Sequence, residues 1–179
     1  WRVRRLDRGW STLVNSSGEE VRVRNIGADV AVGDWVTVDT LVERVESVAP
    51  RRSALVRRAS FEGARAVSHV VAANIDVVFL LHAAPTGVNP RRLERELVLA
   101  YDSGAQPVVL LTKSDAVDQS EIEHQIEVVK SVAPGLAVHA VSSLRNETLE
   151  VLAPYRGFTV ALLGASGVGK STLVNALVG

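Results

Sequence analysis

The sequence contains no cysteine and no methionine, and only 4% of its 179 residues are aromatic. Without cysteine the chain can form neither a disulfide nor a thiolate metal site, so any metal must be held by oxygen or histidine ligands. No apolar run approaches the roughly 20 residues that cross a bilayer, and no basic segment followed by an apolar stretch opens the chain as a signal peptide would. We therefore expect a soluble, cytoplasmic protein that does not bind membranes.

The composition is that of a folded protein, because 47% of the residues are hydrophobic and 22% are charged. This is enough apolar sequence for one large or two small domains. Because the chain begins with Trp1 and lacks methionine, we expect it to be part of a longer protein. The net charge of zero is unevenly distributed, since residues 1–60 hold eleven arginines and eight acidic residues, and residues 61–179 hold nine basic and twelve acidic ones.

The first fifty residues have the period of two that is typical of half-buried strands, with turns about ten residues apart. Strands are expected at residues 2–5, 9–14, 20–24, 35–38 and 41–48. Such a series of short strands indicates a small closed barrel of the OB or SH3-like type. Residues 51–73 show small and basic residues without sustained periodicity, and we expect a connection there.

From residue 74 onward, apolar runs alternate with amphipathic segments. The expected strands are residues 75–81, 107–111, 136–141 and 158–163, and the expected helices are residues 90–104, 120–132, 147–152 and one that begins near residue 169. Buried strands that alternate with helices predict an α/β domain with a parallel sheet covered on both faces.

A glycine-rich loop lies between the last expected strand and the last expected helix. It matches the Walker A pattern of two glycines five residues apart followed by Lys and Ser. In this pattern backbone N–H groups surround a polyphosphate, the lysine neutralises its outer phosphates and the serine hydroxyl holds Mg²⁺. A glycine-rich turn without a ligand is the alternative. The residues are Gly164, Ala165, Ser166, Gly167, Val168, Gly169, Lys170, Ser171 and Thr172, of which Ser171 is the expected Mg²⁺ ligand.

A second motif, Thr112, Lys113, Ser114 and Asp115, follows the strand at residues 107–111 and is a variant of Asn-Lys-x-Asp. A carboxylate at Asp115 can accept hydrogen bonds from the ring N–H and the exocyclic amine of guanine, a donor pair that adenine lacks. The stem of Lys113 can lie across the base. A helix-capping turn is the alternative reading of these four residues. One strand later, Ser142 and Ser143 suit a loop that contacts the guanine carbonyl, or an ordinary serine turn.

The order of these motifs is reversed relative to most GTPases, because Lys113 precedes Gly164 by 51 positions. This predicts a circularly permuted domain, which keeps spatial neighbours while moving the chain ends. With both motifs, the sequence resembles the ribosome small subunit-dependent GTPase A family, RsgA or YjeQ. The resemblance extends to VGDWV at 32–36, PRRSALVR at 50–57, AANID at 72–76 and NPRRLER at 89–95.

The resemblance implies three parts: an OB-fold RNA-binding domain at residues 1–50, a connection at 51–73, and an incomplete, permuted GTPase domain at 74–179. It implies a monomeric GTPase that uses GTP and Mg²⁺, yields GDP, and acts on the small ribosomal subunit and its rRNA in late maturation. Zinc is expected only in a C-terminal domain outside this chain. The switch segments also fall outside it, so no catalytic residue beyond phosphate stabilisation by Lys170 is identified, and this stretch alone is expected to be almost inactive.

Arginines are concentrated in the first domain and in the connection, and the RNA-binding candidates are Arg2, Arg4, Arg5, Arg22, Arg24, Arg51 and Arg52. Arginines near tryptophans favour RNA binding. A solvated face whose acidic residues neutralise the arginines is the alternative. For the whole chain the alternatives are an RNA-binding module with guanine nucleotide as a structural ligand, another permuted assembly GTPase, or an adenine-specific phosphotransferase.

Overall fold

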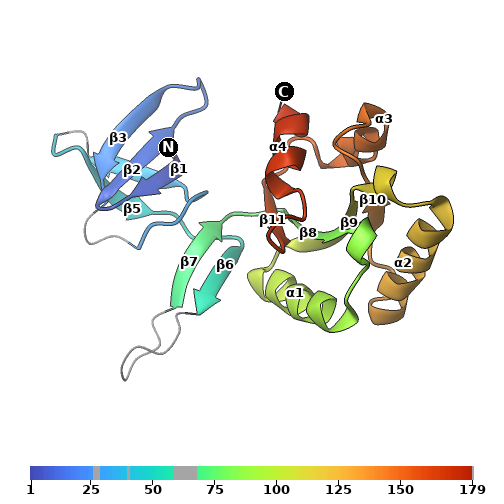
Figure 1. Cartoon of the computed structure of the whole chain (residues 1–179). Coiled ribbons are helices and arrows are strands. Elements are labelled where there is room, and N and C mark those ends of the chain that lie inside the picture. Colours follow the sequence, from blue (N-terminus) through green and yellow to red (C-terminus); the bar gives the residue numbers. More distant parts are fainter. Residues whose placement is uncertain (26–28, 40, 59–67, 179) are drawn as a thin grey trace. The chain divides into compact units, whose positions relative to one another are not determined.

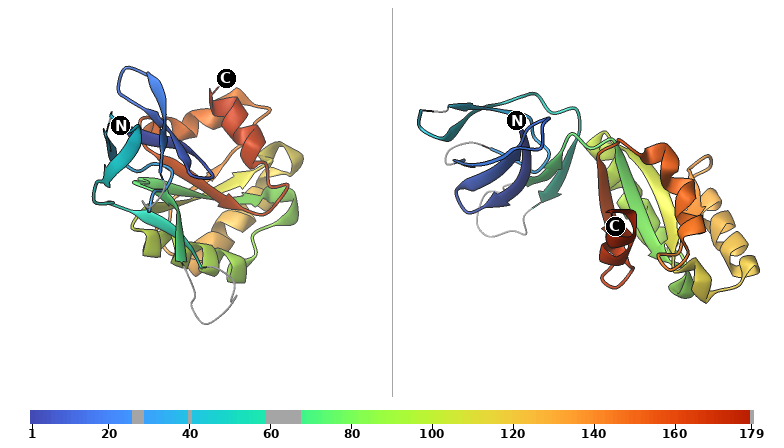
Figure 2. Two further views of the ribbon diagram at one scale, coloured as in Figure 1. Left: turned by 90° about the vertical axis from the view of Figure 1, so that its left-hand side faces the viewer. Right: turned by 90° about the horizontal axis from the view of Figure 1, so that it is seen from above.

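A computed structural model of the chain describes residues 1–25, 29–39, 41–58 and 68–178 (Figure 1). The chain divides into two compact units, residues 1–75 and 76–179. The first unit contains only strands and turns among its described residues, whereas the second alternates strands and helices (Figure 2).

The first unit is built on a mixed five-stranded sheet whose strands run in the order β1-β2-β3-β5-β4. The strands are β1 (Arg2–Asp7), β2 (Trp10–Val14), β3 (Glu20–Arg24), β4 (Val36–Asp39) and β5 (Arg44–Val48). Alternation places one apolar face of each strand inward, where Val3, Leu13, Val23, Val36 and Val45 form a buried cluster. β3 and β5 pair in parallel through Arg24 and Arg44, and the other strand pairs are antiparallel.

The last of these strands begins later than the sequence indicates. The pattern predicts a strand over residues 41–48, but β5 begins at Arg44 and residues 41–43 form a turn. The carboxylate of Asp39 accepts hydrogen bonds from the backbone N–H groups of Leu41 at 2.9 Å and Val42 at 3.3 Å. Such a side-chain bond competes with strand pairing and explains the shorter strand.

The expected connection at residues 51–73 contains two strands that the sequence analysis missed. These are β6 (Ala54–Arg58) and β7 (Ser68–Ala73), which pair in an antiparallel ladder. Residues 59–67 of the expected connection lie outside the described residues. Contact between β7 and the turn before β4 is close, since a Cβ on Gly33 would lie 2.2 Å from the carbonyl oxygen of Ala73.

A buried ion pair holds this turn. Asp34 is fully buried, and its two carboxylate oxygens accept hydrogen bonds from Nε and Nη2 of Arg51, both at 2.8 Å. The same carboxylate accepts the Ala31 N–H at 2.7 Å. Arg51 also donates to the carbonyl oxygen of Asp29 at 2.7 Å. A guanidinium that forms two parallel hydrogen bonds with a carboxylate makes a strong and directional pair. This pairing raises the pKa of Arg51 further above its usual range.

Replacing Asp34 with alanine is expected to destabilise the first unit by about 3 kcal/mol, because Arg51 loses its two-bond carboxylate partner and the Ala31 N–H loses its acceptor. All three tryptophans lie in this unit, so urea unfolding followed by tryptophan fluorescence measures its stability separately. Glu20→Gln breaks the exposed pair with Arg4 and serves as the control, with an expected change of less than about 1 kcal/mol. Equal stabilities of the two variants would contradict the structural role of Asp34.

The second unit contains the predicted parallel sheet, in the strand order β10-β9-β8-β11. Its strands are β8 (Val77–Ala83), β9 (Gln106–Thr112), β10 (Val138–Ala140) and β11 (Val160–Gly164). Every residue of β8 is buried, as expected for a central strand covered on both faces. The predicted boundaries of these strands differ from the observed ones by one or two residues at each end.

Helices cover both faces of this sheet (Figure 1). They are α1 (Pro90–Ser103), α2 (Gln119–Val132), α3 (Asn146–Leu149) and α4 (Lys170–Val178), with 3-10 turns η1 (Ala84–Thr86), η2 (Ser114–Ala116) and η3 (Glu150–Tyr155). α1 and α2 lie on one face, whereas α3 and α4 lie on the other. One helix was predicted over residues 147–152, but α3 gives way to η3, which contains Pro154, and proline does not favour a continuous α-helix.

Candidate nucleotide-binding site

Three loops meet at one edge of the parallel sheet. Because β9, β10 and β11 are parallel, the segments that follow them leave the sheet at the same edge, where ligands of open α/β sheets bind. The glycine-rich loop follows β11, the Thr112–Asp115 motif follows β9, and Ser142 and Ser143 follow β10. The structure therefore brings together the residues that the sequence analysis assigned to phosphate and base binding.

The glycine-rich loop has the backbone form that its residue types favour. A Cβ on Gly164 would lie 2.8 Å from the carbonyl oxygen of Leu81, so only glycine fits the close approach to β8. Gly167 has a φ of 76°, in the left-handed region that side chains disfavour. Val168 is buried and anchors the loop, whereas Ser166 is exposed. Ala165 is half-buried beside Gly164.

Lys170 begins α4 and turns back over the loop. Its ammonium donates hydrogen bonds to the carbonyl oxygens of Gly164 at 2.9 Å and Ala165 at 2.6 Å. Ser171 and Thr172 follow in the first turn of α4 and are exposed. The positive end of the helix dipole and the ammonium thus lie at one place, which is favourable for a phosphate group.

Ser171 is the residue that fits a Mg²⁺ ion. Within the described part of the chain, no three His, Asp or Glu side chains form a group that could hold a metal. A single exposed hydroxyl suits Mg²⁺, because this ion keeps several waters and takes its other ligands from substrate phosphates. The ion would supply positive charge at those phosphates.

The Thr112–Asp115 motif contacts the glycine-rich loop directly. The Thr112 hydroxyl donates a hydrogen bond to the carbonyl oxygen of Val168 at 2.6 Å, and the Lys113 ammonium donates one to the carbonyl oxygen of Gly167 at 2.9 Å. Thr112 is buried, and Lys113 adopts a left-handed backbone with a φ of 56°. Threonine in place of the more common asparagine therefore still provides a donor to the loop.

Removal of this donor is expected to weaken nucleotide binding. Thr112→Val keeps the shape but leaves the buried carbonyl of Val168 without this hydrogen bond, a loss of about 1 to 3 kcal/mol. We expect GDP affinity to fall about tenfold in isothermal titration calorimetry. Thr112→Ser retains the hydroxyl and is the control. Unchanged affinity in Thr112→Val would contradict the coupling of the two loops.

The surroundings of Asp115 favour the ionised form of its carboxyl group. A hydrogen bond from the Ser142 side chain is the main cause that lowers the pKa of the Asp115 carboxyl, and the charge of Arg145 contributes to a smaller extent. The carboxylate form, which can only accept hydrogen bonds, therefore persists to lower pH than in an isolated aspartate. This is the form that can bind the two neighbouring donors of guanine.

The loop after β10 is fixed by a residue that the sequence analysis missed. Thr148 accepts a hydrogen bond from the Ser142 N–H at 2.7 Å and donates through the same hydroxyl toward the carbonyl oxygens of Arg145 and Ser142. Ser142 is fully buried, and Ser143 is half-buried. The only sequence signal for this contact is a threonine within the one-turn helix α3, and this signal is weak.

The arginines of the first unit are placed differently from one another. Arg22 and Arg24 lie over the ring of Trp10, with guanidinium carbons 5.1 and 5.4 Å from its centroid, and Arg2 lies 5.4 Å from the centroid of Trp35. Arg22 also pairs with Asp7 at 3.8 Å, and Arg2 also donates hydrogen bonds to the carbonyl oxygens of Gly33 and Asn74. The remaining candidates have partners as well: Arg4 pairs with Glu20, Arg5 with Asp7 and Arg51 with Asp34, and the backbone N–H of Arg52 donates to the Asn74 side chain.

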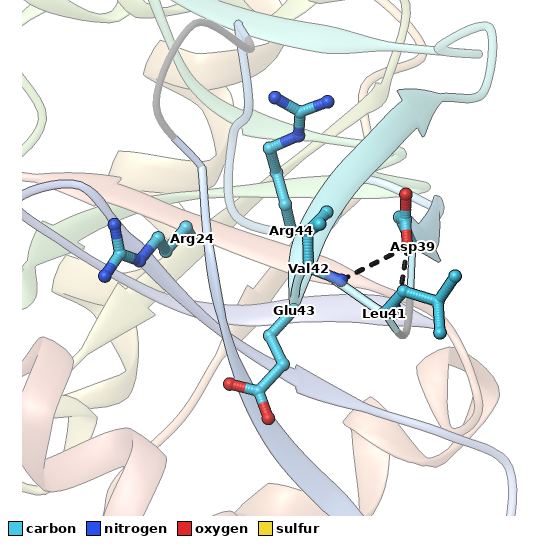
Figure 3. A pocket seen from close by; sticks show the side chains of 6 residues that line it. All are labelled: Arg24, Asp39, Leu41, Val42, Glu43 and Arg44. Carbon is cyan, nitrogen blue, oxygen red and sulfur yellow. Dashed lines mark hydrogen bonds between the residues drawn. The ribbon is translucent and has the colours of Figure 1, made fainter.

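A hollow of about 480 Å³ also lies in the first unit, beside the turn after β4 (Figure 3). It is lined by Arg24, Asp39, Leu41, Val42, Glu43 and Arg44, and the Glu43 side chain points away from that of Arg44. None of these residues belongs to the three loops of the second unit.

The helices that the structure describes include none long and apolar enough to span a membrane.

Comparisons with known proteins identify relatives across the whole chain. The family model of the RsgA GTPase matches residues 48–179. A small ribosomal subunit biogenesis GTPase RsgA from Streptomyces avermitilis is 40% identical over 99% of this chain and 50% of the relative. A protein of the same name from Methanosarcina acetivorans is 38% identical over 93% of this chain and 46% of the relative.

Two solved structures share the fold. YjeQ from Thermotoga maritima matches with a TM-score of 0.76 and 23% identity, over 98% of this chain and 63% of that one. YloQ, described as a circularly permuted GTPase, matches with a TM-score of 0.70 and 23% identity, over 97% and 62%. The chain spans about half the length of the curated relatives it matches. The glycine-rich loop lies downstream of the Thr112–Asp115 motif, and the family model matches most of the chain. The chain therefore belongs to the RsgA GTPase family.

Proposed function

We propose that the second unit binds a guanine nucleotide, with Asp115 selecting the base and the loop from Gly164 to Ser171 holding the phosphates. The two hydrogen bonds from Thr112 and Lys113 to that loop carry this proposal, because they join segments more than fifty residues apart at one edge of the sheet. Direct titration with GDP and ADP tests it. Binding of GDP with no preference over ADP would argue for a phosphate site without base recognition.

In this proposal the protein hydrolyses GTP, as the names of its relatives indicate for them. Lys170 supplies charge at the phosphates, and the positioning of the attacking water is left to residues outside the three loops. Phosphate release from GTP, measured with and without purified small ribosomal subunits, tests the proposal. Tight GTP binding without turnover under either condition would favour a binding module with a structural nucleotide.

The partner in this proposal is the small ribosomal subunit during its maturation in the cytoplasm, again by analogy with the names of the relatives. We further propose that the protein is a monomer away from that subunit. Sedimentation of the protein with small subunits, with large subunits as the control, tests the partner. Equal binding to both subunits would contradict a specific role in small-subunit assembly.

We also propose that the five-stranded sheet is a closed barrel of the OB type. Its strand order and the parallel pairing of β3 and β5 support this assignment. Additional support comes from an antiparallel bridge between Arg2 and Trp35, which joins β1 to the segment before β4. Backbone hydrogen bonds from Val36 N–H to Trp1 and from Val3 N–H to Asp34 continue the same pairing.

Within this barrel, the RNA-binding surface that we propose centres on Trp10, Arg22 and Arg24. An exposed guanidinium next to an aromatic ring can bind a phosphate while the ring stacks on a base. Arg51 is assigned a structural role, because its guanidinium is held by Asp34 and Asp29. The double change of Arg22 and Arg24 to alanine is expected to weaken rRNA binding and to reduce its salt dependence, as measured by filter binding at several salt concentrations.

A further inference from the structure

A buried histidine pairs with a buried glutamate at the carboxyl end of the central strand. His82 belongs to β8 and is 5% exposed, and Glu96 belongs to α1 and is 8% exposed. Nε2 of His82 lies 3.0 Å from Oε2 of Glu96, and Nε of Arg92 donates a hydrogen bond to the other carboxylate oxygen at 2.7 Å. Among the described residues, neither of the two paired atoms has a hydrogen-bond partner apart from this contact. The two side chains therefore depend on each other.

The pair contains a carboxylate in a buried position. Burial by itself raises the pKa of Glu96, because a charge is less stable away from water. The bonds from His82 and Arg92 outweigh this effect, so the pKa lies below its usual value and the group is ionised at neutral pH. A buried ion pair adds little net stability over apolar side chains of similar volume. Stability of the fold therefore does not explain the pair, whereas its directional geometry is something that apolar packing lacks.

The strand segment that carries His82 also supports both loops of the proposed nucleotide site. A Cβ on Gly164 would lie 2.8 Å from the carbonyl oxygen of Leu81, the residue before His82, and Leu81 is the sheet partner of Gly164. The Thr112 hydroxyl, which donates to the Val168 carbonyl oxygen at 2.6 Å, also lies 3.3 Å from the carbonyl oxygen of His82. A displacement of the end of β8 would therefore move both loops.

We propose that the His82–Glu96 pair positions the glycine-rich loop and the Thr112–Asp115 motif for nucleotide binding, by fixing the end of β8 against α1. This inference rests on the nucleotide site proposed above. Both members of the pair are positioning residues, because they act on the nucleotide only through the backbone of β8. A polar contact sets one position of the strand end relative to the helix, whereas a purely apolar core loses a unique arrangement before it loses stability.

A double variant separates positioning from stability. His82→Leu alone leaves the buried Glu96 oxygen without its partner, so we expect it to lower both the thermal unfolding temperature and the affinity for GDP. The helical circular dichroism signal follows this unfolding, because all described helices belong to the second unit. Addition of Glu96→Leu removes the buried charge and should restore the unfolding temperature to at least the wild-type value. GDP affinity of this double variant, measured by titration calorimetry, should still be about tenfold below wild type.

A conservative variant and a control complete the test. His82→Gln keeps a side-chain nitrogen that can donate to Glu96, so its GDP affinity should stay within about twofold of wild type. His124→Leu removes an exposed histidine from α2 and should leave GDP affinity unchanged. His82→Phe combined with Glu96→Met is a second apolar replacement of different shape. The same loss of affinity is expected from whichever double variant keeps the wild-type helical signal.

Wild-type GDP affinity in a stable double variant would overturn this inference, because the pair would then be a feature of the core alone. Binding by His82→Gln as weak as that of the double variant would also overturn it, since the loss would not depend on the polar contact. In either case, loss of GDP binding in Lys170→Ala would leave the proposed function intact. Undiminished GDP binding by Lys170→Ala would instead refute the nucleotide site itself.

Discussion

Replacement of Lys170 by alanine is expected to reduce GDP and GTP affinity by at least about 100-fold. The ammonium already lies against the loop backbone, 2.6 Å from the Ala165 carbonyl oxygen, at the start of α4. A charge-assisted hydrogen bond to phosphate contributes about 1.5 to 3 kcal/mol, and the loss of a partner for the phosphate charge adds to this. Each tenfold change in affinity corresponds to about 1.4 kcal/mol.

Titration calorimetry with GDP measures this effect. Lys130→Ala provides the matched control, since Lys130 is an exposed lysine on α2 that pairs with Glu127 at 2.7 Å. The two variants are expected to show the same tryptophan fluorescence, because all three tryptophans belong to the first unit. Retained GDP affinity in Lys170→Ala would show that the glycine-rich loop is not the phosphate site.

Much of the second unit could be predicted because its signals are local. The apolar run from Val77 to Leu81 indicates the central strand β8, and Pro90 suits the first position of α1. The glycine-rich loop is specified by residue types at fixed spacing. Both kinds of signal depend on short stretches of chain and not on distant partners.

The features that sequence reasoning missed depend on long-range contacts. β6 and β7 are short and pair with each other across residues 59–67, and neither strand has a sustained alternation of its own. The arginine pattern did not distinguish Arg51 from its neighbours, because its role depends on Asp34, seventeen residues earlier, being buried beside it. For the same reason no spacing could show that Thr112 would bond to Val168, 56 residues away.

Sequence reasoning predicted which residues form the site but not the contacts between them. Motif spacing identified Lys113, Asp115 and Lys170, and the parallel sheet explains why they share an edge. Thr148 was not identified, because its role follows from the fold of the loop around Ser142.

Asp115→Asn is expected to remove the preference for guanine. An amide presents one acceptor and one donor where the carboxylate presents two acceptors, so its N–H group opposes the exocyclic amine of guanine. We expect GDP affinity to fall about 100-fold, because a site built around a hydrogen-bonding pattern rejects the wrong partner strongly. Xanthosine diphosphate, which carries an oxygen in place of that amine, should bind the variant more tightly than it binds wild type.

Titration with GDP and xanthosine diphosphate measures this change in base preference. Asp118→Asn is the control, since Asp118 caps α2 by accepting the Glu121 N–H at 2.9 Å and asparagine caps helices equally well. Unaltered selectivity in Asp115→Asn would place base recognition elsewhere, on residues that face a different edge of the purine.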